Sequence, residues 1–136
     1  MKIKETELAW CAGFIDGEGN IRWNGTKTKK QGNRSRCYGN IVLQVAQVHK
    51  EPLDRVLKTL GTGRIYGPYH YNKAKNKQPY YLYSAVSNQA VDALSKIEKY
   101  LSPIKKKQFL DTLELLKEYK KRPKLIKGLG GKYYEK

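Results

Sequence analysis

The stretch that decides the fold is CAGFIDGEG, residues 11–19. Just before it and within it, three small residues recur at intervals of four: Ala9, Gly13 and Gly17. Residues four apart lie on one stripe of an α-helix, and small side chains there let a second helix backbone approach closely. The stripe therefore predicts tight helix packing, either inside the domain or against a second copy of the chain.

The same helix ends in two acidic residues, Asp16 and Glu18, which are interleaved with Gly17 and Gly19. Negative charge is unfavourable at a helix C-terminus because the backbone dipole already places its negative end there. A bound cation would offset this repulsion, and Mg²⁺ is held by one or two carboxylates together with waters and phosphate oxygens. If two such helices packed side by side, acids from two chains would form a metal site that one chain cannot make alone.

Outward from this stretch, hydrophobic periodicity predicts an α+β chain with the order helix, strand, strand, helix, strand, strand, helix, helix. We expect a four-stranded antiparallel sheet with helices on one face and a polar, basic face opposite. In the last strand, either Tyr80 and Leu82 or Tyr81 and Tyr83 could face the open side. The expected elements are residues 5–16, 20–28, 38–48, 50–60, 64–71, 79–86, 88–100 and 103–120, with a polar, basic loop at residues 29–37.

The charge balance indicates a polyanionic partner. Lys and Arg number 28 against 12 Asp and Glu, a net charge of +16, and such a surplus repels itself unless a polyanion meets it. Nucleic acid is the leading candidate, with an anionic membrane or a merely solubilising lysine coat as alternatives. Cys11 and Cys37 are too few for a disulfide framework or a zinc site. With no signal-peptide core and no apolar run near the length of a membrane span, we expect an intracellular, reducing compartment.

Residues 11–19 resemble the LAGLIDADG motif of homing endonucleases. The order of the elements extends the resemblance over residues 1–120, which we take as one domain, but not over the basic tail at residues 121–136. The resemblance implies that the sheet forms a DNA-binding saddle. Because family members with a single motif form homodimers, it also implies a homodimer whose core is the motif helix. The residues expected at that interface are Ala9, Ala12, Gly13, Asp16 and Gly17.

The resemblance further implies a metal-dependent DNA endonuclease that acts in intron homing. The acid at the position of Glu18 ligates Mg²⁺, or Mn²⁺ as an alternative, and binds the scissile phosphate, while the carbonyl of Gly17 can join the metal. Asp16 looks structural in the family. Each subunit would cut one strand, leaving short 3′ overhangs. Glutamate is one carbon longer than the usual aspartate, so Glu18 departs from the pattern in metal geometry.

Two further segments resemble catalytic parts of the family. LQVAQ, residues 43–47, resembles the strand end that places a glutamine beside the attacking water, which assigns that role to Gln47. IKKKQ, residues 104–108, resembles the basic start of the later helix, where Lys105 is the best candidate to approach the active site and Lys107 the next.

The strands are long enough to read DNA. Ten residues of strand rise about 33 Å, close to ten base pairs at about 3.4 Å each, so strand pairs can follow a half-site of a long pseudo-palindromic duplex. Arg can read guanine, Asn and Gln can read adenine, and basic loops hold phosphates. The residues expected to contact DNA are Arg22, Asn24, Thr26, Arg34, Arg36, Tyr38, Asn40, Gln44, Arg64, Tyr66, His70, Lys73 and Lys75.

Two other functions stay open at the level of sequence. The chain could be an RNA maturase or a non-cleaving DNA- or RNA-binding protein of the same fold. It could also be a monomeric, RNA-associated protein of the ribosomal type. Glu18 favours cleavage, because binding alone has no need of an acid beside a phosphate.

Overall fold

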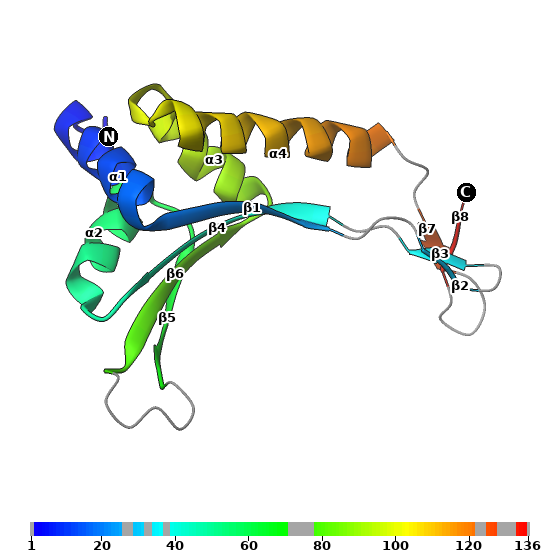
Figure 1. Cartoon of the computed structure of the whole chain (residues 1–136), viewed down its shortest axis with the longest axis horizontal. Helices are drawn as coiled ribbons and strands as arrows, with labels where there is room; N and C mark the ends of the chain where they lie inside the picture. Colours follow the sequence, from blue (N-terminus) through cyan, green and yellow to red (C-terminus); the bar gives the residue numbers. More distant parts are fainter. Residues whose placement is uncertain are drawn as a thin grey trace.

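The structure is a computed structural model that describes residues 2–25, 29–31, 34–36, 39–70, 78–121, 125–127 and 133–135. The expected order of the main helices and strands is confirmed (Figure 1). In the described ranges, no helix combines the length and apolar character needed to cross a membrane. The elements are α1 (Glu5–Glu18), β1 (Gly19–Gly25), β2 (Lys29–Gln31), β3 (Arg34–Arg36), β4 (Gly39–Gln47), α2 (Lys50–Leu60), β5 (Arg64–Tyr69), β6 (Tyr80–Val86), α3 (Asn88–Ile97), the 3₁₀ turn η1 (Glu98–Tyr100), α4 (Pro103–Lys121), β7 (Leu125–Lys127) and β8 (Tyr133–Glu135).

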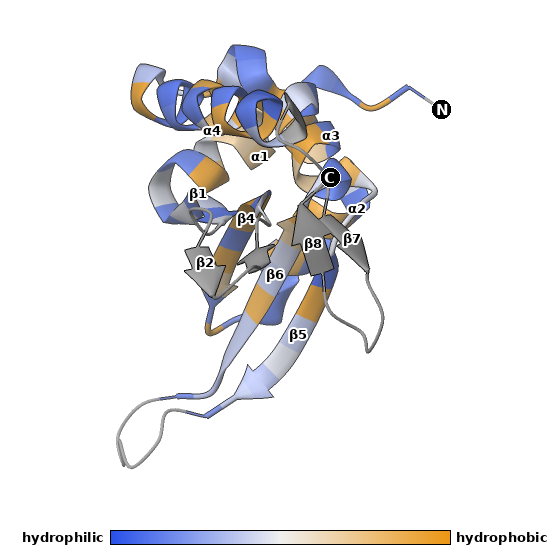
Figure 2. Cartoon of the chain, turned by 90° about the vertical axis from the view of Figure 1, so that its right-hand side faces the viewer, coloured by the Kyte–Doolittle hydropathy of each residue, from blue (hydrophilic) through white to orange (hydrophobic). Residues whose placement is uncertain are grey.

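Strands β1, β4, β6 and β5 form one antiparallel sheet in that spatial order. Successive side chains of a strand point to opposite faces, and Figure 2 shows this as alternating bands of hydropathy along the strands. The helices lie on one side of the sheet and leave the other side open (Figure 1). The strand residues buried in the helix-side core are Ile21, Ile41, Leu43, Val45, Tyr83 and Ala85.

The facing of β6, which the sequence left open, is decided by Tyr83. Its ring is fully buried in the helix-side core, and its hydroxyl donates a 2.7 Å hydrogen bond to the carbonyl of Thr62. Burial raises the pKa of this phenol above its ordinary range. By alternation, Tyr80 and Leu82 therefore face the open side.

Helix α1 is held to α2 by a cluster on its N-terminal half. The guanidinium of Arg55 donates hydrogen bonds of 2.9 and 3.0 Å to the two carboxylate oxygens of Glu7, and this lowers the pKa of Glu7. The same guanidinium lies 3.9 Å from the centre of the Trp10 ring, which stacks on Phe14 with centroids 5.2 Å apart. These contacts fix the rotation of α1 about its axis.

Three segments differ from the sequence expectations. Helix α1 runs to Glu18 rather than ending at residue 16, because the backbone N–H of Gly19 still bonds the carbonyl of Ile15. The expected loop at residues 29–37 contains two short paired strands, β2 and β3. The two residues between them are Gly-Asn, a pair typical of two-residue hairpin connections. The C-terminal tail likewise contains a two-stranded sheet of β7 and β8.

Candidate active site

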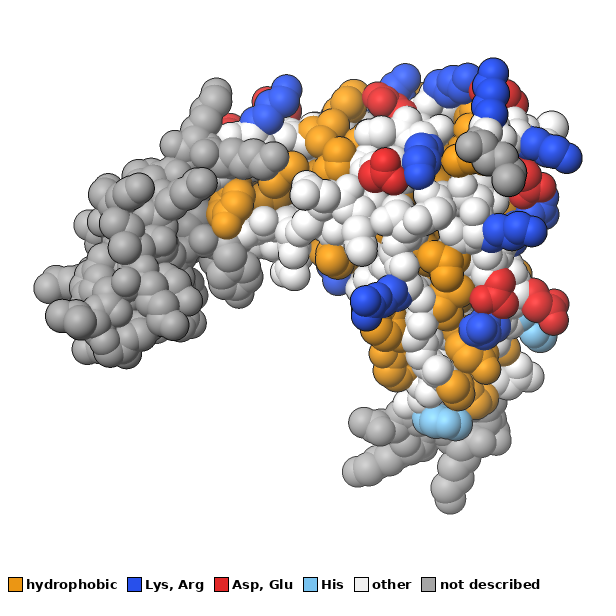
Figure 3. Space-filling view, turned by 180° about the vertical axis from the view of Figure 1, so that it is seen from behind, with side chains coloured by type: hydrophobic (Ala, Val, Ile, Leu, Met, Phe, Trp, Pro, Cys, Tyr) orange, Lys and Arg blue, Asp and Glu red, His pale blue; other side chains and the backbone are white. Residues whose placement is uncertain are grey.

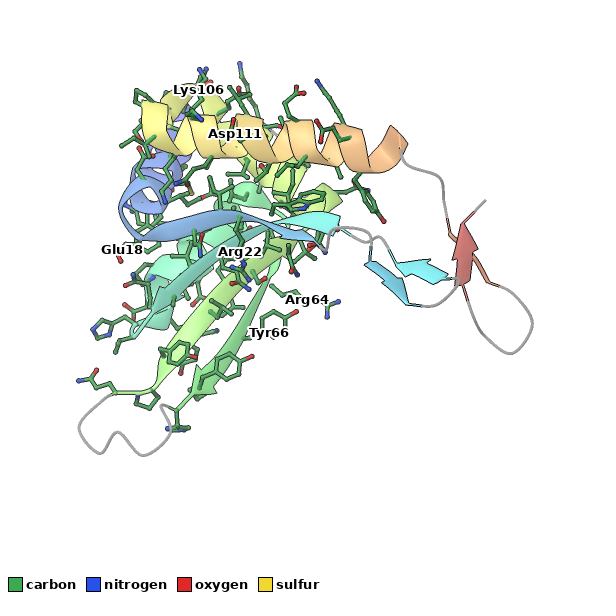
Figure 4. All side chains as sticks on the ribbon, turned by 45° about the vertical axis from the view of Figure 1, so that its right-hand side comes forward. Glu18, Arg22, Arg64, Tyr66, Lys106 and Asp111 are labelled. Carbon is green, nitrogen blue, oxygen red and sulfur yellow. The ribbon has the colours of Figure 1, made fainter. Side chains whose placement is uncertain are left out.

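The register of β1 and β4 brings Gln47 to the acidic end of α1. Gly19 pairs with Val45 in this antiparallel ladder, so the last residue of β4 lies beside the last turn of α1. The Nε2 atom of Gln47 donates a 3.3 Å hydrogen bond to Oε2 of Glu18. The carboxylate is exposed and points outward from the α1–β1 junction (Figure 4). The structure therefore places these two expected catalytic residues in direct contact.

Lys105 reaches the same junction from the first turn of α4. Its Nζ donates a 2.6 Å hydrogen bond to the carbonyl of Gly19, the residue that follows Glu18. The positively charged ammonium group of Lys105 is thereby held one residue along the chain from Glu18, the candidate metal-binding carboxylate. Lys107, the second candidate, forms instead an exposed 2.8 Å ion pair with Asp111 one turn along α4, and the hydrogen bond that its Nζ donates to the Asp111 carboxylate raises the pKa of Lys107.

Asp16 joins α1 to the start of α4. Both of its carboxylate oxygens accept hydrogen bonds from the backbone N–H of Ser102, at 3.1 and 3.0 Å. The hydroxyl of Ser102 accepts in turn from the N–H of Lys105 at 3.5 Å, as an N-cap residue does. Asp16 therefore sets where the helix that carries Lys105 begins. Sequence reasoning missed Ser102, although a serine before Pro103 at a helix start is a recognisable capping signal.

The exposed side of α1 carries the small-residue stripe. Ala9, Gly13 and Gly17 are exposed, and a Cβ atom added to Gly13 or Gly17 would meet no atom within 4 Å among the described residues outside the adjacent turns of the helix. Ala12 was expected at the same interface, but that assignment is wrong because its side chain is fully buried in the protomer's own core. Ala12 shares the inward face with Cys11, since adjacent residues are only about 100° apart around a helix.

The open face of the sheet carries most of the expected DNA-contacting residues that the structure describes. Figure 4 shows Arg22, Arg64 and Tyr66 on the side of the sheet opposite α4. Arg22, Asn24, Arg64, Tyr66 and His70 are exposed. Asn40 is half-buried, and its Oδ1 atom has no hydrogen-bond partner among the described residues. Thr26, Tyr38, Lys73 and Lys75 lie outside the described residues, as do the side chains of Arg34 and Arg36.

Tyrosines add an aromatic region to this part of the sheet. Tyr66 and Tyr69 are 43% and 41% exposed, and the rings of Tyr69 and Tyr80 lie 5.6 Å apart. Figure 3 shows hydrophobic side chains gathered over the lower part of the molecule, whereas Lys, Arg, Asp and Glu are interspersed over the helices. Exposed rings beside arginines suit a partner that offers both flat apolar surface and phosphate charge.

The acidic end of α1 offers one carboxylate per chain to a metal. In the part of the chain that the structure describes, no three His, Cys, Asp or Glu side chains converge on one point. The atoms at the junction that could ligate a metal are oxygens: the exposed Glu18 carboxylate and the backbone carbonyls at the helix end, which lack partners inside the helix. This donor set fits Mg²⁺, which prefers oxygen ligands and keeps several waters.

Comparison with known proteins agrees with this fold. The profile of the family described as LAGLIDADG endonuclease matches residues 11–118. The chain therefore belongs to the LAGLIDADG endonuclease family. No curated protein sequence matches it significantly.

Solved structures with the same fold include several homing endonucleases. One is I-CvuI in complex with the I-CreI target and Mg²⁺, with the DNA not cleaved; it has a TM-score of 0.64 and 22% identity over 86% of this chain and 69% of that one. The group I intron-encoded I-CeuI, complexed with DNA, has a TM-score of 0.63 and 18% identity, covering 88% of this chain and 58% of that one. The archaeal I-Vdi141I, also complexed with DNA, has a TM-score of 0.59 and 24% identity, covering 83% and 68%.

Proposed function

We propose that the chain is a site-specific endonuclease that cuts both strands of duplex DNA as a homodimer, using Mg²⁺. The observation that carries the proposal is the meeting of Glu18, Gln47 and Lys105 at the exposed end of α1. Membership of the LAGLIDADG endonuclease family supports the reaction class. The complexes of I-CvuI, I-CeuI and I-Vdi141I with DNA support a DNA duplex as the partner.

The homodimer is supported by the exposed side of α1. Between Ala9 and Gly17 this side offers only small residues, flanked by the partly buried rings of Trp10 and Phe14. The sole charged residue in that span, Asp16, is already bonded to the backbone of Ser102. A helix that is apolar on both sides is typically buried on both sides. A second copy packed on this stripe would bring two Glu18 carboxylates and two Gly17 carbonyls close together.

The residues at the junction suit phosphodiester hydrolysis. When bound, Mg²⁺ would neutralise charge on the phosphoryl oxygens and favour ionisation of an attacking water. In our proposal Glu18 and the Gly17 carbonyl hold the metal. Gln47 donates a hydrogen bond to Glu18 through Nε2, and its amide oxygen can accept a hydrogen bond from the attacking water. Lys105, anchored on the Gly19 carbonyl, places a positive charge where the leaving oxygen develops negative charge.

The open face of the sheet would follow each half of the target. Two copies related by a two-fold axis recognise a target with the same symmetry, so we expect a long pseudo-palindromic site. Each active site cuts one strand, and the expected products carry short 3′ overhangs. The biological role that fits these properties is intron homing.

The proposal is tested by Glu18→Gln, which keeps the size and hydrogen bonding of the side chain but removes its charge. The substrate is a duplex spanning the candidate intron-insertion site, and cutting is followed with Mg²⁺, with Mn²⁺ and with EDTA. We expect metal-dependent cutting by the wild type, loss of about 100-fold or more in rate for Glu18→Gln, and unchanged binding in Ca²⁺. The matched control is Glu51→Gln, an exposed acid on α2, which should cut normally.

The alternatives give different outcomes. If the wild type and Glu18→Gln bind the duplex equally and neither cuts, the endonuclease proposal fails and a non-cleaving or maturase function remains. If the wild type binds RNA but no duplex DNA and sediments only as a monomer, an RNA-associated protein of the ribosomal type is indicated.

A further inference from the structure

A row of hydrogen-bonded side chains crosses the open face of the sheet over three strands. On β1, the Nη1 atom of Arg22 donates a 2.7 Å hydrogen bond to Oε1 of Gln44 on β4. The Nε2 atom of Gln44 donates in turn to Oγ of Ser84 on β6, at 3.4 Å. Gln44 and Ser84 are register partners, so the row follows from strand pairing and needs no loop to form it.

Arg22 also lies over a closely packed part of this face. Its register partner on β4 is Val42, whose other partner is Val86 on β6. Val42 is only 2% exposed although it does not belong to the helix-side core. The stem of Arg22 therefore stands against a well-covered apolar neighbour, while its charged end is tied to Gln44. Both ends of the side chain are restrained before any ligand is present.

The hydrogen bonds of the row indicate different roles for Arg22 and Gln44. A glutamine reads adenine by using its amide oxygen and its amide nitrogen together, and in Gln44 each of these atoms already makes one hydrogen bond within the sheet, which leaves one N–H and one lone pair. Arg22 uses one of its five N–H donors in the row, so the rest of its planar fork remains available. A guanidinium held in one orientation matches the two acceptors that guanine presents in the major groove.

We propose that Arg22 reads a guanine in each half-site, and that Gln44 and Ser84 are positioning residues that hold its guanidinium rather than base-reading residues themselves. This inference rests on the proposed function, because it requires sequence-selective DNA binding. It revises the sequence expectation that Gln44 contacts DNA directly. Arg22 is four residues beyond Glu18, about 13 Å along an extended strand, so the guanine should lie about four base pairs from the cleaved bond.

The test is selection of bound duplexes from a randomised DNA pool in Ca²⁺, followed by sequencing. We expect the wild type to select guanine at one symmetric pair of positions, and Arg22→Ala to lose a preference of about ten- to 100-fold there. Gln44→Leu, which keeps the bulk but loses both hydrogen bonds, should weaken the same preference several-fold. Ser84→Ala should weaken it less, because its contact is longer, and Ser84→Thr should restore it.

Ser95→Ala, at an exposed position of α3, is the control and should leave this position unchanged. The proposal is overturned if Gln44→Leu relaxes a different position from Arg22→Ala, or if the position that depends on Arg22 is not guanine. If circular dichroism shows that Gln44→Leu does not fold, Ser84→Ala and Ser84→Thr are compared instead. The proposal holds if Ser84→Ala weakens the guanine preference at the position that depends on Arg22 and Ser84→Thr restores it, and it is overturned if Ser84→Ala relaxes a different position. Selection of no sequence by the wild type would remove the proposed function, and this inference with it.

Discussion

The substitution Gly13→Ala distinguishes two possibilities for α1: its small-residue side faces solvent, or it packs against a second copy of the chain. Among the described residues outside the adjacent turns of the helix, a Cβ at Gly13 meets no atom within 4 Å. Alanine is about 1 kcal/mol more favourable than glycine inside a helix. An isolated protomer carrying Gly13→Ala should therefore gain about 1 kcal/mol in free energy of unfolding, equivalent to about 3–5 °C in Tm for a domain of this size.

In the homodimer, Gly13→Ala should be unfavourable, although it stabilises the isolated protomer. Extra methyl groups in a closely packed contact cost about 1–3 kcal/mol, and a two-fold interface receives one methyl from each chain. A net loss of about 2 kcal/mol in association would raise the dissociation constant about 30-fold. We therefore expect Gly13→Ala to dissociate the dimer while improving the helix that it occupies.

Sedimentation velocity over a range of protein concentrations measures the dimer, and thermal unfolding at the same concentrations measures stability. The matched control is Ser95→Ala, an exposed position of α3, where helix propensity also improves but no interface is expected. Ser95→Ala should raise the Tm slightly and leave sedimentation unchanged. Loss of duplex cleavage by Gly13→Ala with retained folding would show that the active site needs the helix contact.

One result would rule out a close helix–helix contact at the small-residue stripe of α1. If Gly13→Ala raises the Tm, sediments as the wild type does and cleaves DNA at the same rate, the stripe on α1 is not a close helix–helix contact. The small residues would then need another explanation, and two Glu18 carboxylates would not meet across α1.

Two further predictions concern the fold itself. A Cβ at Gly39 would overlap the ring of Trp23 across the strand pair, so Gly39→Ala should lower the free energy of unfolding by about 1–3 kcal/mol in urea titrations; an unchanged midpoint would contradict this packing. Burial raises the pKa of Cys11 and of Tyr83 above their ordinary values of 9.0 and 10.0, so the folded state favours their protonated forms. The stabilisation is present at neutral pH and is lost as the pH rises above these ordinary values. The urea midpoint should therefore fall from pH 9 upward, and should fall less steeply in Tyr83→Phe.

Local pattern was sufficient to predict the order of the main helices and strands and the buried side of β1 and β4. Alternation placed Ile21, Leu43 and Val45 on the buried face, and the structure has them there. The same reasoning could not orient β6, because both alternatives, Tyr80 with Leu82 and Tyr81 with Tyr83, consist of large aromatic or aliphatic side chains. Tyr83 is buried because its hydroxyl reaches the Thr62 carbonyl, and that partner lies outside β6.

Helix boundaries and faces were less predictable. Ala12 was assigned to the interface together with other residues of the motif helix, yet its angular position on α1 turns it into the core. The glycine at position 17 suggested an early helix end, but glycine costs only about 1 kcal/mol in a helix interior. The contacts of Asp16 with Ser102 and the capping bond of Gly19 outweigh that cost.

The class of the protein was readable from the sequence: a nine-residue motif at residues 11–19 that carries Glu18, a period-2 pattern in four strands and a strong positive charge. These are local or summed properties, so they can be read without coordinates. Which side chains lie together at the end of α1 depends on the tertiary structure. Gln47 lies 29 residues from Glu18, and Lys105 lies 86 from Gly19. Their contacts depend on the β1–β4 register and on where α4 begins, and a one-residue slip of the register would turn the whole strand over.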